Sequence, residues 1–368
     1  MGRASLLGMI TIPEHGPLDE HGRLLHEDDA AAQLALAVSR LEASLAASGR
    51  TLADLAELRV STTDPAAIEG VYDVLTERLE ATGARADVRV EPADALAVPG
   101  MLVSLAAQPR PGTLLVVVAH PDDEAFGCGS VLAHASAHGL RSVVVCATRG
   151  ELGEPAPGSG LTRAELPAVR ERELREACRL LGAERVEVLG YVDSGVDGAP
   201  AAGSLAAAPP DEVRDRVAAI VEELRPDVVV TLDASDGHRD HAVMRDATLA
   251  ALDRVAHRPR RTYLFCLARS LMTEFTGVAT LGTPDDELTT LVDVADLLDL
   301  RWRAIRTHAS QVPPFDAMGP ELQHGFLAVD RLLRVDPPWT GGPTETTWLP
   351  THLTTTITSP MTTKEPTS

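Results

Sequence analysis

The strongest constraint on the fold is a regular alternation of valine-rich runs and amphipathic stretches that begins at residue 113. The first run, TLLVVVAH, has valines on both faces, which is typical of a central strand in a parallel sheet. Similar apolar runs occur at residues 141–148, 185–191, 226–233 and 261–268. The apolar spacing of helices occurs at residues 131–139, 166–182, 209–225 and 241–255. Residues 113–336 are therefore predicted to form an α/β domain with a doubly wound, mostly parallel sheet.

The preceding segment, residues 1–107, has a different pattern that starts with short apolar runs broken by turn signals. Its further predicted elements are helices at residues 30–48 and 65–83 and short strands at residues 57–63, 86–92 and 101–107. The order ββ-α-β-α-ββ predicts a compact, smaller α+β domain. The stretch QPRPG at residues 108–112 contains Pro and Gly with few apolar residues and is interpreted as a linker.

Composition bears on disorder, partners and location. Residues 337–368 are rich in Thr and Pro, lack periodicity and are predicted to form a disordered tail. The net charge of −21 argues against nucleic acid and anionic membrane surfaces, whose phosphates would be repelled. No apolar run has the length of a membrane span, the first residues lack a sustained signal-peptide core, and the four cysteines have no CxxC spacing. These features are typical of a cytoplasmic protein with reduced thiols.

Polar clusters follow two of the predicted central strands. The sequence AHPDDE ends the first strand, and LDASDGHRDHAVMRDA comes at the end of the strand at residues 226–233. Ligands of doubly wound sheets bind beyond the carboxyl ends of the strands, so the two clusters are expected to meet. Carboxylates at the end of an apolar strand need compensation for their charge. The chemically capable side chains are His120, Asp122, Asp123, Glu124, His238, Asp240 and His241.

These side chains suit a divalent metal ion. Two imidazoles and one carboxylate, with open positions for water, form a recurring catalytic zinc set, and the same donors suit non-haem Fe(II). A remaining carboxylate and a remaining imidazole could serve as base and as acid or oxyanion donor in the hydrolysis of an amide. Either cluster alone would be typical of an exposed loop. Two clusters at equivalent strand ends favour a site, although spacing alone leaves the role of each residue open.

Several motifs occur in order between residue 113 and about residue 315: AHPDDE, TRGE, VRERELREACRLLGA, the DSG of GYVDSG, and HRDHAVMRDA. In this order they resemble the PIG-L/LmbE-like metal-dependent deacetylases, which include N-acetylglucosaminyl-inositol deacetylase and mycothiol S-conjugate amidase. The resemblance implies zinc bound by His120, Asp123 and His241. It implies Asp122 as the general base.

The same resemblance assigns roles to the second cluster. It implies that His238 stabilises the oxyanion or acts as an acid, and that Asp240 tunes His238 without binding the metal itself. The family usually has HPDH at this point, whereas Arg239 replaces the proline here, which changes the rigidity of the loop but no ligand.

The resemblance also assigns contacts with the substrate, and these have competing interpretations. The matching residues are Arg170, Asp193, Glu151 or Glu154, His308 and Gln311. Arg170 matches an arginine that contacts sugar hydroxyls, and Asp193 matches a carboxylate that lines the same pocket in mycothiol-related members. A solvated helix residue is an equally good interpretation of Arg170, and a histidine at a helix end is nearly as good for His308.

The phrases AAQLALAVSRLEASLAASGRTLADLAELRVSTTD, VYDVLTERL and GARADVRVE resemble the Rid/YjgF family. That family forms chorismate-mutase-like trimers with ligand clefts between subunits, and its active members hydrolyse imines with an arginine that matches Arg85. A water-positioning carboxylate on the last strand is absent, because Ser104 stands there. The domain could be a deaminase, a binding module for a carboxylate-bearing small molecule or an oligomerisation unit. The trimerising module is favoured.

The expected activity is metal-dependent hydrolysis of an N-acyl amide, most simply N-acetyl. The substrate would be a small molecule: an amino sugar, a glycoconjugate or an intermediate of specialised metabolism. The alternative is a Rid-type imine or enamine deaminase, or a small-molecule-binding protein, in which the N-terminal domain carries the main activity. In either case a homo-oligomer, as a trimer through that domain, is expected.

Overall fold

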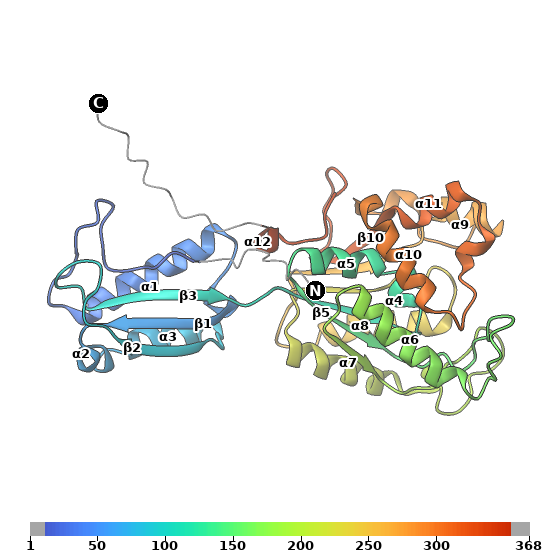
Figure 1. Cartoon of the computed structure of the whole chain (residues 1–368), viewed down its shortest axis with the longest axis horizontal. Coiled ribbons are helices and arrows are strands. Elements are labelled where there is room, and N and C mark those ends of the chain that lie inside the picture. The colour runs from blue at the N-terminus through green and yellow to red at the C-terminus, as the bar shows by residue number, and fades with distance from the viewer. Residues whose placement is uncertain (1–11, 355–368) are drawn as a thin grey trace. The chain divides into compact units, whose positions relative to one another are not determined.

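The computed structural model describes residues 12–354, which fall into two compact units. Unit 1 contains the described residues up to Pro111 together with the stretch from Thr351, and unit 2 spans Gly112–Pro350. Figure 1 shows the elements of each unit. Among the described residues, no helix combines the length and the apolar character that a bilayer span requires. The four cysteines are all buried and free, which agrees with the prediction of reduced thiols.

Unit 1 is an α+β structure with a three-stranded sheet. Its elements are α1 (Ala30–Ala47), β1 (Leu55–Thr62), α2 (Pro65–Glu69), α3 (Asp73–Thr82), β2 (Asp87–Pro92), β3 (Val103–Pro109) and the short α12 (Thr351–Thr354). The strand order is β2-β1-β3, with β1 parallel to β2 and antiparallel to β3. The side chain of Asp29 caps α1 by accepting a hydrogen bond from the backbone of Ala32. The buried leucines of α1 pack with the inward side chains of the sheet in one core cluster.

Three predictions for this segment need correction. The two strands expected before α1 are reduced to isolated bridges, His15 with Leu105 and Leu18 with Leu24, and residues 1–11 lie outside the described residues. The single helix expected at residues 65–83 is two helices, because the chain turns at Gly70 after α2. Strand β3 extends to Pro109, so the expected linker at residues 108–112 narrows to the residues between β3 and β4.

Unit 2 contains a seven-stranded sheet. Its strands are β4 (Thr113–Val118), β5 (Arg141–Cys146), β6 (Arg185–Val188), β7 (Val228–Leu232), β8 (Arg261–Phe265), β9 (Thr290–Asp293) and β10 (Val329–Asp336). The order is β6-β5-β4-β7-β8-β10-β9. Strands β4 to β8 pair in parallel, while β10 is antiparallel to both β8 and β9. The predicted α/β fold with a mostly parallel sheet is therefore confirmed.

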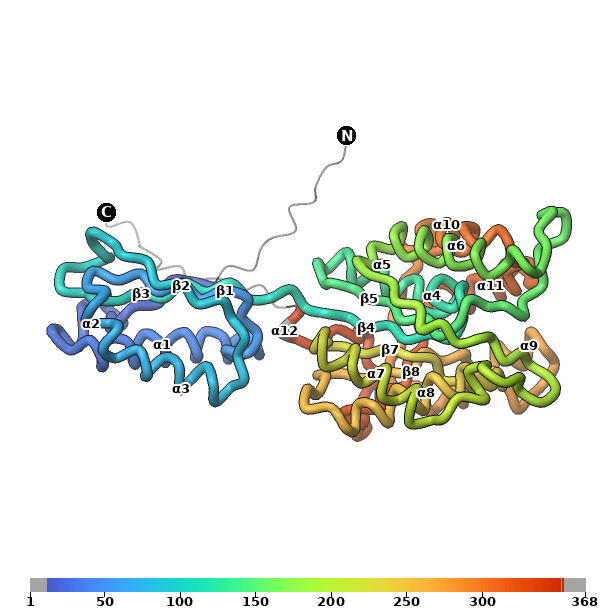
Figure 2. The backbone as a smooth tube through the Cα atoms, turned by 90° about the horizontal axis from the view of Figure 1, so that it is seen from below, coloured from blue at the N-terminus to red at the C-terminus, as the bar shows by residue number. Residues whose placement is uncertain are grey.

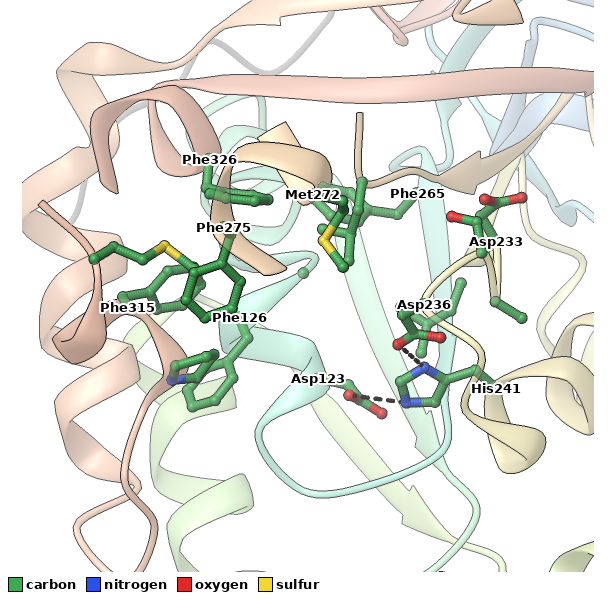
Figure 3. Close-up of a pocket in the computed structure, with 17 residues that line it drawn as sticks. Asp123, Phe126, Asp233, Asp236, His241, Phe265, Met272, Phe275, Phe315 and Phe326 are labelled. Atoms are coloured by element: carbon green, nitrogen blue, oxygen red, sulfur yellow. Dashed lines mark hydrogen bonds and ion pairs between the residues drawn. The ribbon is translucent and has the colours of Figure 1, made fainter. Parts of the chain in front are cut away.

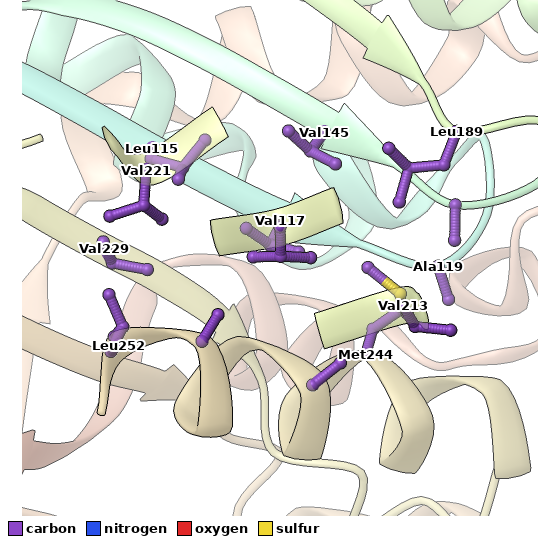
Figure 4. Close-up of a cluster of buried hydrophobic side chains, with 14 of the residues drawn as sticks. Leu115, Val117, Ala119, Val145, Leu189, Val213, Val221, Val229, Met244 and Leu252 are labelled. Atoms are coloured by element: carbon purple, nitrogen blue, oxygen red, sulfur yellow. The ribbon is translucent and has the colours of Figure 1, made fainter. Parts of the chain in front are cut away.

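Helices cover both faces of this sheet. They are α4 (Asp123–Phe126), α5 (Gly129–Ala137), α6 (Leu166–Leu180), α7 (Pro210–Leu224), α8 (Arg239–Leu252), α9 (Arg269–Thr276), α10 (Leu298–Thr307) and α11 (Pro320–Leu327). Helices α7 and α8 pack together on one face, and α5, α6 and α10 lie on the other (Figure 2). In Figure 4, Val117 and Val229 of the sheet face Val213, Val221 and Met244 of α7 and α8. Burial of these side chains on both faces explains the valine-rich sequence of the strands.

The strand order fixes where a ligand can bind. Strand β4 lies between β5 and β7 in the sheet. The chain runs from β4 to β5 and β6 on one side of β4, and then crosses to β7 and β8 on the other side. The loops that follow β4 and β7 therefore diverge and leave a crevice between them at the carboxyl end of the sheet. These two loops carry the AHPDDE and HRDH sequences.

Residues 337–350 are not a disordered tail, contrary to the prediction. Glu345 forms a bridge with Thr290 of β9, and its side chain pairs with Arg334 of β10 at 2.5 Å. Trp348 is completely buried, with its ring edge-to-face against His134. One buried aromatic residue and one added strand contact outweigh the polar composition of the stretch. The rest of the predicted tail, residues 355–368, lies outside the described residues.

Candidate active site

The loop after β4 is a tight turn held by its own carboxylates. Asp122 has a positive φ of 114°, which is rare for a residue other than glycine and is found where surrounding contacts enforce it. Its backbone N–H donates to Glu124 Oε2 at 2.9 Å. The Oδ2 of Asp123 accepts hydrogen bonds from the backbone N–H groups of His120 at 2.8 Å and Ala119 at 3.2 Å. The carboxylates of the HPDDE sequence therefore stabilise the turn on which they lie.

The loop after β7 leads directly into α8. His238 is the N-cap residue of this helix, and its Nδ1 accepts a hydrogen bond from the backbone N–H of Asp240 at 3.2 Å. His241 follows in the first turn, and its Nδ1 contacts Asp236 Oδ2 at 2.7 Å. Arg239, in the place of the family's usual proline, donates to the carbonyl oxygens of Val196 and Gly198. The start of α8 is thereby tied to the loop that follows β6.

The two loops bring three imidazoles together, as expected from the sequence. The ring centroids of His120 and His238 are 4.6 Å apart, those of His238 and His241 4.7 Å, and those of His120 and His241 5.3 Å. Each of the three offers a ring nitrogen within 4.8 Å of the others. A second group with the same spacing joins His120 to Asp193 and Asp240, and Asp123 belongs to neither group among the described residues.

Asp123 nevertheless contacts two of the imidazoles, one with each carboxylate oxygen. His120 Nδ1 lies 3.6 Å from its Oδ2, and His241 Nε2 lies 3.4 Å from its Oδ1. The other nitrogen of His120 is held by Asp240 at 3.1 Å, and the other nitrogen of His241 by Asp236. A carboxylate behind each histidine is the arrangement that orients an imidazole for metal binding.

The polar groups of this cluster fit a divalent cation. Within the described part of the chain, the buried Nε2 of His241 has no hydrogen-bond partner, although Asp123 lies beside it. Burial opposes the charge of His241, but Asp123 and Asp236 outweigh it and raise the pKa of His241 to about 11. Burial likewise opposes the charge of His120, and hydrogen bonds with Asp123 and Asp240 raise its pKa to about 9. The surrounding carboxylates therefore favour positive charge at this point, which a metal ion would supply.

Asp122 is held by Arg170. The guanidinium group donates from Nη2 to Asp122 Oδ2 at 2.9 Å and to the carbonyl of Pro121, and from Nη1 to the carbonyl of Gly150 at 2.9 Å. Burial raises the pKa of Asp122 to about 6, although the charge of Arg170 opposes this shift. Arg170 itself is only 4% exposed, so it is not the solvated helix residue that was one interpretation of the sequence.

A polar cavity of about 310 Å³ opens over these groups. Besides His120, Asp122, Asp123, His238 and His241, its walls contain Leu152, Gly153, Arg170, Asp193, Gly195, Val196 and Gln311. Asp193 is fixed by hydrogen bonds from the backbone of Gly195 at 2.8 Å and Leu152 at 3.4 Å. Of the residues expected to contact substrate, Arg170, Asp193 and Gln311 thus face the cavity.

The other expected substrate residues have different positions. His308 is 1% exposed, and its Nε2 contacts Glu124 Oε1 at 2.6 Å, so it lies behind the turn and supports Glu124. Glu151 accepts a hydrogen bond from the backbone of Asp193 at 3.0 Å and so positions that residue. Glu154 is exposed and pairs with Arg163. A buried pair such as His308 and Glu124 cannot be distinguished in sequence from two groups that face a ligand.

Two further differences concern the acidic residues of the second cluster. The carboxylate of Asp240 was expected to tune His238, but it contacts His120 and accepts a hydrogen bond from the backbone of Ser194 at 2.9 Å. Asp236 was not among the candidate residues predicted from the sequence, although it stands five residues before His241 in the same motif. The rule that a metal-binding histidine has a carboxylate behind it was the signal that could have identified Asp236.

In unit 1, Arg85 is exposed and precedes β2. Ser104 is buried on β3 and donates a hydrogen bond to Glu14 Oε1 at 2.5 Å. A carboxylate thus stands next to Ser104, but it comes from the segment before α1 rather than from the last strand.

Comparison with known proteins relates this chain to a family of deacetylases. The family model described as PIG-L, GlcNAc-PI de-N-acetylase, matches residues 115–252. A 1D-myo-inositol 2-acetamido-2-deoxy-alpha-D-glucopyranoside deacetylase of Kineococcus radiotolerans is 34% identical over 61% of this chain and 76% of its own length. The protein of the same name from Acidothermus cellulolyticus is 33% identical over 59% of this chain and 87% of its own.

Among solved structures, N,N'-diacetylchitobiose deacetylase from Pyrococcus horikoshii is similar to this chain with a TM-score of 0.45 and 22% identity. The similarity covers 60% of this chain and 83% of that protein.

Proposed function

Because the chain belongs to the PIG-L family of GlcNAc-PI de-N-acetylases, we propose that it is a metal-dependent hydrolase that removes an N-acyl group, in the simplest case acetyl, from an amino sugar. One observation carries the proposal. Asp123 is contacted by two imidazoles, each of which has a second carboxylate at its other ring nitrogen, and the partly buried carboxylate of Asp122 is the neighbouring side chain. Hydrolysis of an amide needs this combination of an electrophile site and an adjacent base.

We propose that His120, Asp123 and His241 hold the metal, and that it is zinc. Two imidazoles and one carboxylate leave open positions and are a common catalytic zinc set, although Fe(II) accepts the same donors. A bound divalent cation would polarise the amide carbonyl and lower the pKa of water. His238 is left outside this set, because its Nδ1 already accepts the hydrogen bond from Asp240.

The proton transfers follow from the environment of two side chains. Asp122, whose pKa of about 6 is close to neutrality, accepts the proton of the attacking water. Arg170 fixes its carboxylate in place. Burial, together with the neighbouring His120 and His241, lowers the pKa of His238, which favours the neutral form of this imidazole. Since its Nδ1 accepts a hydrogen bond, its proton is on Nε2, from which it can stabilise the oxyanion.

The polar cavity supports an amino sugar or a related glycoconjugate as the substrate. Arg170 and Asp193 supply a donor and an acceptor on its walls, and Gln311 supplies both. Sugar hydroxyl groups require this mixture of partners. The names of the two relatives specify an acetamido sugar linked to inositol, which makes such a conjugate the first compound to test.

The test is metal analysis of the full-length protein combined with acetate release from a panel of N-acetylated amino sugars. We expect one metal ion per chain and acetate release. Asp122→Asn should keep the metal and lose activity by about 10²–10⁴-fold. Asp211→Asn, which changes an exposed carboxylate on α7, is the matched control and should behave as the unmodified protein. A metal-loaded protein that releases no acetate from any member of the panel would contradict the proposal.

For unit 1 we propose the role of an oligomerising, Rid-like module. The outer face of its sheet carries exposed charges of both signs, with Arg89 Nη2 3.5 Å from Glu57 and Arg59 Nη1 4.0 Å from Glu91. Such a face can pair with complementary charges of another copy. Light scattering of the full chain should give the mass of a trimer, and a monomer at every concentration would exclude this role.

A further inference from the structure

A second cavity, of about 290 Å³, adjoins the candidate metal site and is lined mainly by apolar side chains. All five phenylalanines of the chain line it: Phe126, Phe265, Phe275, Phe315 and Phe326. Leu232, Leu267, Met272 and Met318 add to its apolar surface. In Figure 3, Asp123, Asp236 and His241 stand at one end, and Phe126, Phe275 and Phe315 lie toward the other.

The phenylalanines come from distant parts of unit 2. Phe126 ends α4, Phe275 lies in α9 and Phe326 in α11. Their rings support one another at the wall, with centroids 5.5 Å apart for Phe126 and Phe315 and 6.4 Å apart for Phe275 and Phe326. Aromatic residues are only 3% of the chain, so this gathering is not a consequence of composition. A purely structural core would close the space between its side chains, whereas these leave a cavity.

The two cavities share Asp123 and His241 as wall residues. The polar cavity contains the proposed base, the oxyanion donor and the partners for hydroxyl groups. An amide whose carbonyl reacts beside Asp123 and His241 has one polar part, the sugar that bears its nitrogen, and one part bonded to the carbonyl carbon. The sugar matches the polar cavity, which leaves the phenylalanine-lined cavity for the acyl part.

We propose that this second cavity binds the acyl group of the substrate, and that this group is an apolar chain longer than acetyl, such as butanoyl or hexanoyl. The inference rests on the proposed function, since it assumes hydrolysis of an N-acyl amide at the same site. An acetyl methyl group would contact only a small part of this wall. Each further methylene that enters it gains roughly fourfold in binding from apolar burial.

Two series of compounds test the proposal on the zinc-loaded, full-length protein. The first is hydrolysis of N-acetyl-, N-butanoyl- and N-hexanoylglucosamine, for which kcat/KM should rise by roughly fourfold per methylene. The second series measures the binding of acetate, butanoate and hexanoate by calorimetry, which requires no turnover. Their affinity should rise by a similar factor per methylene. A flat or falling dependence on chain length in the carboxylate series would overturn the proposal.

The carboxylate series also separates the two proposals. If N-acetylglucosamine is hydrolysed fastest and hexanoate binds no better than acetate, the acyl cavity is wrong and the proposed hydrolase stands. If no amide is hydrolysed, the proposed function fails, and the binding of the carboxylates still decides whether the cavity takes an apolar chain.

Two substitutions test whether the dependence on acyl-chain length arises in the phenylalanine-lined cavity. Met272→Trp fills the cavity from α9 and should reduce the ratio of hexanoyl to acetyl kcat/KM by at least tenfold, whereas Phe275→Ala enlarges it and should shift the preference to longer chains. Leu152→Trp adds the same bulk to the polar cavity and is the matched control. If Leu152→Trp changes the preference for chain length and neither cavity variant does, the acyl group binds in the polar cavity and the proposal is wrong.

Discussion

Asp122 and Arg170 form the pair on which proton transfer in the proposed reaction depends. The carboxylate is partly buried in a turn where Asp122 has a positive φ, and the guanidinium group that contacts it also donates to the carbonyl groups of Pro121 and Gly150. Arg170 therefore acts on the base and on the loop at once. This position explains why an arginine rather than a lysine stands here, since only the planar guanidinium can serve several acceptors in fixed directions.

Replacement of Arg170 should move the acidic limb of the pH–rate profile. The charge of Arg170 lowers the pKa of Asp122, which burial raises to about 6. Activity requires the ionised carboxylate and is lost as the pH falls through this pKa. Arg170→Met removes the opposing charge, so the pKa rises and half-maximal activity moves to higher pH. Arg170→Lys keeps the charge and should move it less. Equal profiles for both variants and the unmodified protein would show that Arg170 does not act on Asp122.

Asp236 should control the affinity for the metal. Its Oδ2 holds His241 Nδ1 at 2.7 Å and so fixes the direction of the other ring nitrogen. Loss of such a carboxylate typically weakens metal binding by about 10–100-fold. We expect Asp236→Asn to show this loss in a competition titration with a chelator, whereas Asp246→Asn, an exposed change on α8, should leave the affinity unaltered. Equal affinities for the two variants would remove Asp236 from the site.

At the scale of elements, the short helix α4 is fixed at its C-terminal end by the buried ion pair of Arg301 and Asp330. Arg301 of α10 is 1% exposed and donates to the carbonyl groups of Phe126 and Gly127. Asp330 of β10, which is completely buried, lies 3.4 Å from Arg301 and accepts a hydrogen bond from Ser130 at 2.5 Å. The loop after β4 is thus fixed by α10 and β10, which come more than 170 residues later in the chain.

Arg301→Met should destabilise the protein strongly, because it leaves Asp330 buried without its partner. Removal of one member of a buried pair costs about 3–5 kcal/mol, whereas replacement of both members by apolar groups is often neutral. Urea unfolding should therefore show a large loss of stability for Arg301→Met and a partial recovery for Arg301→Met combined with Asp330→Leu. If the double variant is less stable than the single one, the pair contributes through contacts other than compensation of charge.

The sequence predicted the elements that are long or strongly patterned. The buried strands β4, β5 and β7 and the amphipathic helices α6 to α8 lie where the apolar runs and spacing placed them. The four-residue elements α4 and β9 are too short for any periodicity to be recognised. Pairing of β10 with β8 and β9 depends on contacts distant in sequence, so local patterns could not reveal it. The cluster of histidines and carboxylates was predictable, but the partner of each imidazole was not.

At the scale of the whole molecule, every proposed catalytic residue lies in unit 2, and this unit continues to Pro350. The stretch after β10 looked disordered because its composition is dominated by Thr, Pro and Gly. No local pattern indicated that Trp348 would be fully buried within unit 2.

Truncation should therefore separate two parts of the C-terminal stretch. A chain that ends at Pro350 keeps Trp348 and Glu345 and is the reference for unit 2. A chain that ends at Asp336 loses Trp348 and Glu345 and should unfold at a lower temperature. The substitution Trp348→Ala alone should cost about 3–5 kcal/mol. Equal melting temperatures for the two truncated chains would show that residues 337–350 do not stabilise unit 2.

The most direct test of the central claim is anomalous diffraction at the zinc absorption edge from crystals of the full chain grown with zinc. We predict one strong peak, coordinated by His120, Asp123 and His241, with Asp122 and His238 beside it. A peak that lies elsewhere, or density in which His120 and His241 turn away from each other, would contradict the proposed hydrolase.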